Sequence, residues 1–306
     1  MVQGTVDIQN LSGRSEDVEA AIAARKQGFI RTFVKRNKVG ALGFAIFIAI
    51  LLLAFIGPFF MPGKNPTVVA DIYAKPSWRH PLGGDYMGKD VWYQIVYGGR
   101  TLLIVSGLAA FISTFIGVVL GAISALFGGK TDAFLLMIAD IVMTVPTIIL
   151  LAVLAAYVRL DNPLLLSLVL SVTAWPALLR AVRSQVLTLK EREYVEAARM
   201  LDLGTGHILF REVIPNMMSY IVINFVFAMT GAIYGQVILF FLGLVPLAGE
   251  NWGLMINQAY TKGAIFFKDS LLYILSPIFM ISLLQLSLVM ISNAMEDVFN
   301  PRLREE

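Results

Sequence analysis

The chain has 306 residues, of which 58% are hydrophobic and only 15% are charged, and its formal net charge at pH 7 is +3. A soluble domain is about 45–50% apolar and about 25% charged, so this composition excludes a disordered chain, a coiled coil and most soluble enzymes, and predicts a membrane protein. Cysteine is absent and only two histidines are present, which excludes a disulfide framework and a thiolate metal site and leaves little for a histidine metal site.

Residues 1–39 are predicted to form an N-terminal arm outside the membrane. Phe29, Ile30, Phe33 and Val34 recur at helical spacing, and basic residues occupy the positions between them. This pattern predicts an amphipathic helix that lies in the membrane interface. The same basic residues could instead serve only as a flank that sets the topology of the first span.

Residues 40–306 are predicted to form one membrane domain. Six apolar stretches reach the roughly 20 residues that a helix needs to cross a hydrocarbon core about 30 Å thick. They cover residues 40–60, 102–127, 134–158, 164–182, 217–241 and 271–295. Pro146 and Pro176 interrupt the third and fourth stretches and predict kinks there. The fold class is therefore all-α, a polytopic protein with six transmembrane helices.

Lysine and arginine are unevenly distributed between the two sides that six spans define. The N-terminal arm and the connection between the fourth and fifth spans carry most of them. The side of the membrane that holds these two segments therefore has more lysine and arginine residues than the other side. Since cytoplasmic loops carry such an excess, both termini are predicted to be cytoplasmic. Residues 183–216 then form a cytoplasmic segment, and residues 61–101 and 242–270 form extracytoplasmic loops.

Few polar side chains fall inside the predicted spans. Asp140 is the one acidic residue well inside a span, and because a carboxylate in lipid costs several kcal/mol, we expect it to face other helices or water. It could pair with a base or cap broken backbone near Pro146, or it could contact a substrate. Asn224, Tyr234 and Gln236 of the fifth span are further candidates for residues that line a pathway.

Two pairs of glycines lie one helical turn apart within spans. Gly117 and Gly121 form the first pair, and Gly231 and Gly235 form the second. Small residues at this spacing let helix backbones approach closely. Each pair therefore predicts either close packing within the chain or a contact with another subunit.

No catalytic constellation is recognisable in the sequence. Gly129-Lys130-Thr131 imitates the end of a phosphate-binding loop, but Ser124 stands where that loop requires its first glycine. The sequence has neither the zinc-protease pattern His-Glu-x-x-His nor the nucleophile elbow Gly-x-Ser-x-Gly. We therefore expect a protein that is not an enzyme and that itself binds neither a cofactor nor a metal.

The connection between the fourth and fifth spans is long, charged and helix-prone. Tyr194, Ala197, Ala198 and Leu201 are predicted to form one small-to-apolar face of a short helix. Its charged neighbours are Glu193, Glu196 and Arg199. Thr205 is predicted to cap a second helix that ends before Pro215. Two short helices at an angle make a rigid knob, which suits a groove on a soluble partner.

This segment resembles the Glu-Ala-Ala loop of bacterial ABC importer permeases. The resemblance rests on Glu196-Ala197-Ala198 followed by Ile214-Pro215. Asp202 stands where that family has a glycine, and Gly204 follows closely. Aspartate is among the few residues that tolerate a left-handed backbone, so we expect the bend after the first helix to persist.

The chain as a whole is similar to the second-permease branch of the dipeptide/oligopeptide/nickel permease family. The similarity covers roughly residues 29–304, and its further blocks keep the family's order along the chain. They are residues 33–38, residues 82–91 with 97–100, the trio Asp132, Asp140 and Pro146, and residues 241–244, 251–253 and 297–302. Lys89 replaces the arginine that is usual in the second block.

The resemblance implies a type I ABC importer permease in the cell membrane of a prokaryote. It implies a heterodimer with a homologous second permease, two cytoplasmic ATPase subunits that bind ATP and Mg²⁺, and an extracytoplasmic substrate-binding protein. It implies that the coupling helix around Glu196–Leu201 contacts an ATPase, and that residues 61–101 and 242–270 receive the binding protein. Trp78, Trp92 and Trp252 in those loops could equally be interface anchors.

Several alternatives remain at the level of sequence. Within the family the cargo could be di- or oligopeptides, oligosaccharides or nickel. A different class, an ion-coupled secondary carrier, should show paired inverted repeats and broken helices in corresponding halves, and the sequence shows no such pair. A membrane scaffold without transport is the third class.

Overall fold

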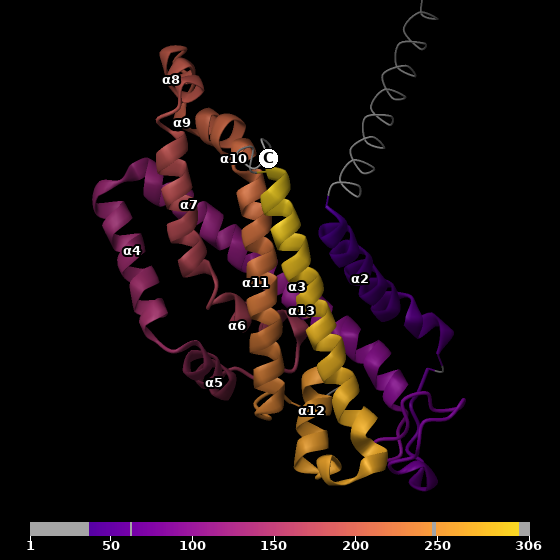
Figure 1. The fold of residues 1–306 in the computed structure, drawn as a ribbon. Helices are drawn as coiled ribbons and strands as arrows, with labels where there is room; N and C mark the ends of the chain where they lie inside the picture. The colour runs from indigo at the N-terminus through magenta and orange to yellow at the C-terminus, as the bar shows by residue number, and fades with distance from the viewer. Residues whose placement is uncertain (1–36, 62, 247–248, 300–306) are drawn as a thin grey trace, which may run out of the picture.

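The computed structural model describes residues 37–61, 63–246 and 249–299 (Figure 1). The predicted amphipathic helix around residues 29–34 and the end of the closing block at residues 300–302 lie outside the described residues. The described part contains helices and no named strand, which agrees with the all-α prediction.

Four unbroken helices are long and apolar enough to cross a membrane. They are α2 (Lys38–Phe55), α3 (Val91–Phe127), α11 (Met218–Phe241) and α13 (Leu271–Phe299). Two bent pairs account for the third and fourth predicted spans, so the structure has up to six spans if each pair counts as one. These pairs are α4 (Gly129–Thr144) with α5 (Thr147–Tyr157), and α6 (Pro163–Ser171) with α7 (Trp175–Leu189).

The two bends lie at the prolines that the sequence marks. The angle between α4 and α5 is 90°, and the angle between α6 and α7 is 54°. Val145, before Pro146, has an extended backbone, because a proline ring disfavours the helical conformation of the residue that precedes it. Pro176 occupies the first turn of α7, where its missing N–H matters least. Both spans predicted as kinked are therefore broken into separate helices.

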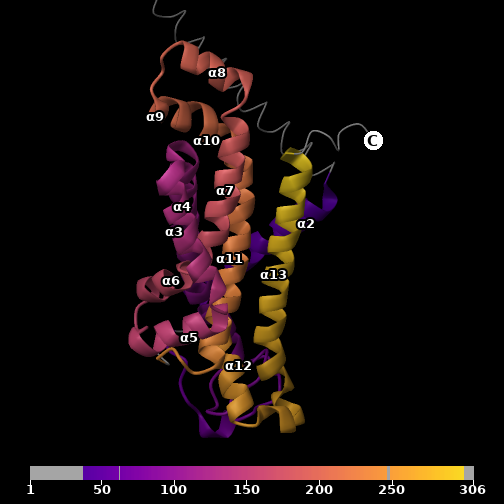
Figure 2. The same cartoon turned by 90° about the vertical axis from the view of Figure 1, so that its left-hand side faces the viewer.

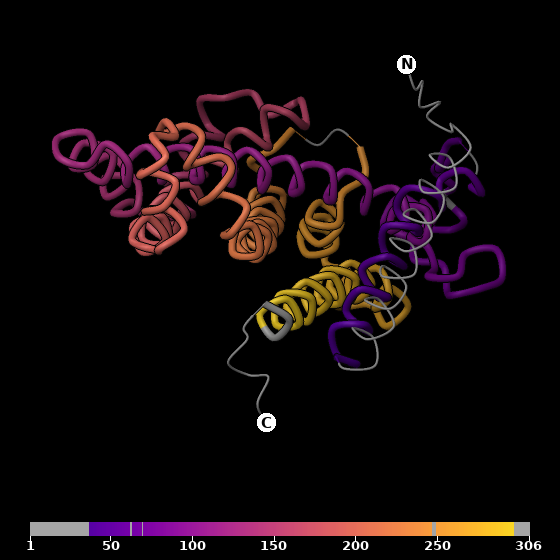
Figure 3. Tube along the Cα trace, turned by 90° about the horizontal axis from the view of Figure 1, so that it is seen from above, coloured from indigo at the N-terminus to yellow at the C-terminus, as the bar shows by residue number. Residues whose placement is uncertain are grey.

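Helix α3 begins earlier than predicted and is the central element of the fold. The side chain of Asp90 accepts a hydrogen bond from Trp92 N, so the helix starts at Val91 and not near residue 102. Its 37 residues correspond to about 55 Å. In Figure 3 it runs across the whole molecule, and α7, α11, α6 and α2 pack against it. The predicted outer loop 61–101 is therefore loop only as far as residue 90.

The first glycine pair lies where α3 packs on α7. A Cβ atom on Gly117 would lie 2.7 Å from Leu178 Cγ, and one on Gly121 would lie 2.7 Å from the carbonyl oxygen of Leu179. This pair therefore mediates packing within the chain. In the second pair, a Cβ atom on Gly235 would meet Leu170, whereas one on Gly231 would have no neighbour within 4 Å among the described residues.

Replacing Gly121 with Ala is expected to destabilise the protein by about 1–3 kcal/mol, because the rigid α7 backbone must move away from the new methyl group. Gly107 lies on the same helix with nothing within 4 Å of its Cβ position, so Gly107→Ala should be neutral or stabilising by about 0.5–1 kcal/mol. The melting temperatures of the two variants in detergent measure this difference. Equal melting temperatures would contradict the packing described here.

The two ends of the molecule carry different structures (Figure 2). The segment predicted to be cytoplasmic comprises α8 (Glu193–Met200), α9 (Thr205–His207), the π-helix η3 (Ile208–Val213) and α10 (Ile214–Asn216). It lies at the same end as the start of α2 and the end of α13, as the prediction of both termini on one side requires. The predicted segment 183–216 begins inside α7.

The opposite end holds α12 and four short 3₁₀ turns. Helix α12 covers Trp252–Thr261, and the turns are η1 (Gly57–Phe60), η2 (Val69–Asp71), η4 (Ala264–Phe266) and η5 (Lys268–Ser270). Trp252 is buried, and its Nε1 donates a hydrogen bond of 2.8 Å to the carbonyl oxygen of Ile95. Trp252 belongs to α12 and packs against α3, so it is neither an interface anchor nor a docking residue. Trp78, by contrast, is fully exposed.

Candidate functional site

Helix α8 is held against the membrane domain by one of its faces. Val195 and Ala198 are buried and belong to an apolar cluster at the end of the molecule that carries the knob. The other buried members of this cluster come from α3, α7 and the η3–α10 segment: Ala122, Ala125, Leu178, Val182, Val186, Ile208, Leu209, Val213 and Met217. Helix α8 packs directly on η3, and the shared apolar cluster connects it from there to α3 and α7.

The other face of α8 is exposed. Tyr194 and Ala197 are exposed, and Leu201 just beyond the helix is 73% exposed. Glu193, Glu196 and Arg199 are exposed beside them. Tyr194, Ala197, Ala198 and Leu201 lie within an arc of about 100° around the helix axis, as predicted for one face. Ala198 lies at the edge of this face that adjoins Val195, and it is buried, whereas Tyr194 and Ala197 are exposed.

The turn after α8 is a left-handed one formed by Asp202, whose φ is 54°. Leu203 N donates to the carbonyl oxygen of Ala198 at 3.2 Å, and Asp202 N donates to that of Arg199 at 2.9 Å. These two bonds are the Schellman pattern that satisfies the last carbonyls of a helix. Leu203 packs against the same apolar cluster as Ala198. The expectation that aspartate keeps the bend is confirmed, and Gly204, with φ of −55°, is not the left-handed residue.

The second helix of the knob differs from the prediction at both ends. Thr205 is its first helical residue and makes no capping hydrogen bond, since Gly204 occupies the capping position. The helix does not end before Pro215 but continues through η3 into α10. Pro215 therefore lies inside a continuous helix, where its missing N–H removes one backbone hydrogen-bond donor. The wider π-helical turns of η3 directly precede it.

Two ion pairs join α4 to α7 beneath the knob. Arg183 makes a bidentate contact with Asp132, with Nε–Oδ1 at 2.6 Å and Nη2–Oδ2 at 2.5 Å. The hydroxyl of Ser124 on α3 also donates to Asp132. Asp140 pairs with Arg180, and both of these side chains are about half exposed. The structure thus brings the predicted Asp140 to a base on the neighbouring broken span.

The three polar residues predicted on α11 do not converge. Asn224 donates to the carbonyl oxygen of Tyr220 on its own helix at 2.9 Å. Tyr234 is half exposed, whereas Gln236 is fully buried and its side-chain amide has no hydrogen-bond partner within the described residues. Two residues apart on a helix lie about 200° apart around its axis, so Tyr234 and Gln236 face opposite ways.

Comparison with known protein families shows the family to which this architecture belongs. Residues 117–305 match the family of the binding-protein-dependent transport system inner membrane component. The chain belongs to this family. Residues 27–76 match the N-terminal transmembrane domain of oligopeptide transport permease C. Membership in this permease family confirms the resemblance inferred from the sequence. The family consists of membrane components of ABC importers, which are not themselves enzymes.

Curated relatives cover nearly the same length. The oligopeptide transport system permease protein OppC of Bacillus subtilis is 30% identical over 278 residues, which are 89% of this chain and 88% of that protein. The dipeptide transport system permease protein DppC of the same organism is 31% identical over 275 residues, 89% of this chain and 84% of that protein. A Brucella ovis protein named as a peptide permease is 33% identical over 269 residues, 87% and 88% of the two chains.

Proposed function

We propose that this chain is a permease subunit of an ATP-driven, binding-protein-dependent importer of di- or oligopeptides. It would form half of the translocation pathway, with a homologous second permease forming the other half. The partners would be two cytoplasmic ATPases, which bind ATP and Mg²⁺, and an extracytoplasmic binding protein. The family match and three relatives named for peptides support this assignment. Both termini would lie in the cytoplasm.

The exposed face of α8 is the single observation that carries the proposal. Tyr194, Ala197 and Leu201 form a small exposed apolar patch, flanked by charged residues, at the end that we propose to be cytoplasmic. Such a surface on a rigid short helix fits a groove on a soluble partner. In this proposal the charges of Glu193, Glu196 and Arg199 form the polar rim of that contact.

The mechanism follows from how α8 is attached. Closure of the two ATPases would displace α8, and the apolar cluster would carry the displacement to α3 and α7 as one body. The ion pairs of Arg183 and Arg180 would pass it to α4. The helices would then alternate between inward-facing and outward-facing packings, because close-packed cores switch between discrete states.

Reconstitution of the complete complex in liposomes tests the proposal. Uptake of a labelled tripeptide should require both ATP inside and the peptide-loaded binding protein outside, and the loaded binding protein should stimulate ATP hydrolysis. Uptake that follows an ion gradient without ATP would instead indicate a secondary carrier. Stimulation only by an oligosaccharide-loaded or nickel-loaded binding protein would reject peptides as the cargo.

A further inference from the structure

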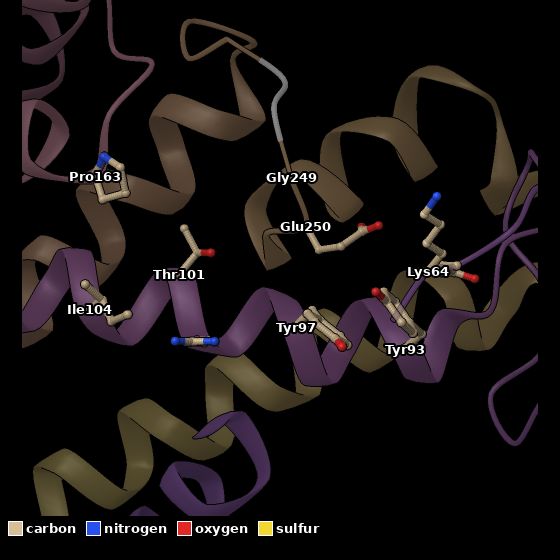
Figure 4. Close-up of a pocket in the computed structure, with 10 residues that line it drawn as sticks. Lys64, Tyr93, Tyr97, Thr101, Ile104, Pro163, Gly249 and Glu250 are labelled. Atoms are coloured by element: carbon tan, nitrogen blue, oxygen red, sulfur yellow. The ribbon is translucent and has the colours of Figure 1, made fainter. Parts of the chain in front are cut away.

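A cavity of about 670 Å³ lies at the outer end, beside the first turns of α3 (Figure 4). Three segments far apart in the sequence line it: Lys64 and Asn65, α3 from Tyr93 to Ile104, and Gly249 with Glu250 before α12; Pro163 of α6 closes one side. Its volume falls within the range of about 300–1,000 Å³ that is usual for small-ligand sites. It lies at the opposite end of the molecule from the knob.

The floor of the cavity is rigid and aromatic. Tyr93 and Tyr97, one turn apart on α3, stack with ring centroids 4.2 Å apart. Figure 4 shows the two rings side by side on α3, below Glu250. This part of α3 is held from behind, because Trp252 packs on Gly98 and Gly99 and hydrogen bonds to Ile95. Stacked tyrosines offer apolar surface together with polar edges.

Charges of both signs surround this floor. Lys64 and Arg100 are exposed cations, and Glu250 is a half-buried anion. In the part of the chain that the structure describes, none of the three has a hydrogen-bond or ion-pair partner; Arg100 has only the ring of Phe55, 6.0 Å from its guanidinium carbon. Burial raises the pKa of Glu250, and the nearby Lys89 opposes that shift. A partly buried carboxylate that has neither a hydrogen bond nor an ion pair is unfavourable, so a ligand that supplies a cation would add to the effect of Lys89 and stabilise it.

The positions of the charged groups are supported by local structure. The side chain of Asn65 both donates to the carbonyl oxygen of Asp90, at 3.0 Å, and accepts from Asp90 N, at 2.9 Å. These bonds hold the Lys64 segment against the start of α3. The side chain of Asn251, next to Glu250, accepts from Gly253 N at 2.8 Å and caps α12. The cavity is therefore a formed site and not a gap between loose loops.

We propose that this cavity binds a free peptide through its two charged termini. Glu250 would bind the α-ammonium group, Arg100 would bind the α-carboxylate, and the Tyr93–Tyr97 stack would pack against the backbone and side chains. A zwitterion is the ligand that satisfies unpaired charges of both signs together. Binding through the two termini does not depend on which side chains the peptide carries, so one site could accept peptides of many different sequences. This inference rests on the proposed function and adds a binding site in this chain.

The experiment uses the complete complex in nanodiscs without the binding protein. Binding of trialanine, N-acetyl-trialanine and trialanine amide is measured by calorimetry. We expect trialanine to bind at least tenfold more tightly than either blocked peptide. Glu250→Gln should weaken trialanine binding at least fivefold and abolish the discrimination against N-acetylation. Arg100→Gln should do the same for amidation. Glu296→Gln, an exposed glutamate on α13, is the matched control and should leave all three affinities unchanged.

The decisive measurement is whether Glu250→Gln weakens the binding of trialanine more than the binding of N-acetyl-trialanine. If Glu250→Gln weakens trialanine and N-acetyl-trialanine equally, the carboxylate does not bind the ammonium group and the proposal is wrong. If it leaves peptide binding unchanged but weakens capture of the binding protein, the cavity is a protein-docking surface and the proposal is also overturned. ATP-dependent uptake by the unmodified complex is measured in parallel, so loss of this site and failure of the proposed function are distinguishable.

Discussion

Replacing Ala197 with Arg is expected to lower ATP-dependent transport at least tenfold without lowering the melting temperature of the permease. Ala197 is exposed on α8, so a large side chain there meets no neighbour within this chain. In the proposed complex it would lie under the ATPase groove and force the two surfaces apart. Loss of a central contact in an interface commonly costs 2 kcal/mol or more, which is about 30-fold in affinity.

Co-purification of the ATPase and stimulated ATP hydrolysis measure this effect. Ala197→Ser is the matched control, since it keeps the side chain small and should retain coupling. Ala198→Arg should behave differently, because Ala198 is buried in the apolar cluster and a charged side chain there would lower the melting temperature itself. Normal transport by the Ala197→Arg variant would show that α8 is not the contact with the ATPase.

Replacing Arg183 with Ala is expected to destabilise the permease by about 2–3 kcal/mol and to reduce transport with it. The change removes both charge-assisted hydrogen bonds to Asp132 and leaves the hydroxyl of Ser124 as its one side-chain hydrogen-bond partner among the described residues. Asp132 is mostly buried at the junction of α3, α4 and α7, so its unpaired carboxylate is poorly compensated. Helix α4 would then be less firmly tied to the element that carries the knob.

Arg180→Ala supplies the comparison for this prediction. Arg180 and Asp140 are each about half exposed, and exposed ion pairs contribute about 0–1 kcal/mol. Its melting temperature should therefore fall less than that of Arg183→Ala. The exchange variant Asp132→Arg with Arg183→Asp should recover part of the stability. Equal losses for Arg180→Ala and Arg183→Ala, or no recovery on exchange, would contradict the role given to the Asp132 pair.

The helices that cross the membrane could be predicted from the sequence because the requirement is local. A span needs about 20 consecutive apolar residues whatever surrounds it, and α2, α11 and α13 lie close to their predicted limits. The breaks at Pro146 and Pro176 and the left-handed turn at Asp202 are local as well, since they follow from the backbone preferences of single residues. The extension of α3 to Val91 was missed because Gly98, Gly99 and Arg100 separate its first two turns from the long apolar stretch, and those turns pack on α12.

The sequence by itself therefore determined that this is a membrane protein, that its fold is all-α, and that a charged helical knob lies between the fourth and fifth spans. Only the tertiary structure decided that Ala198 is buried while Ala197 is exposed, that Asp140 meets Arg180, and that Trp252 packs on α3. The cavity lined by Lys64, Arg100 and Glu250 also appears only in the fold. The physical reason is common to these cases: each depends on contacts between residues far apart in the chain, and neither periodicity nor composition records which distant residues those are.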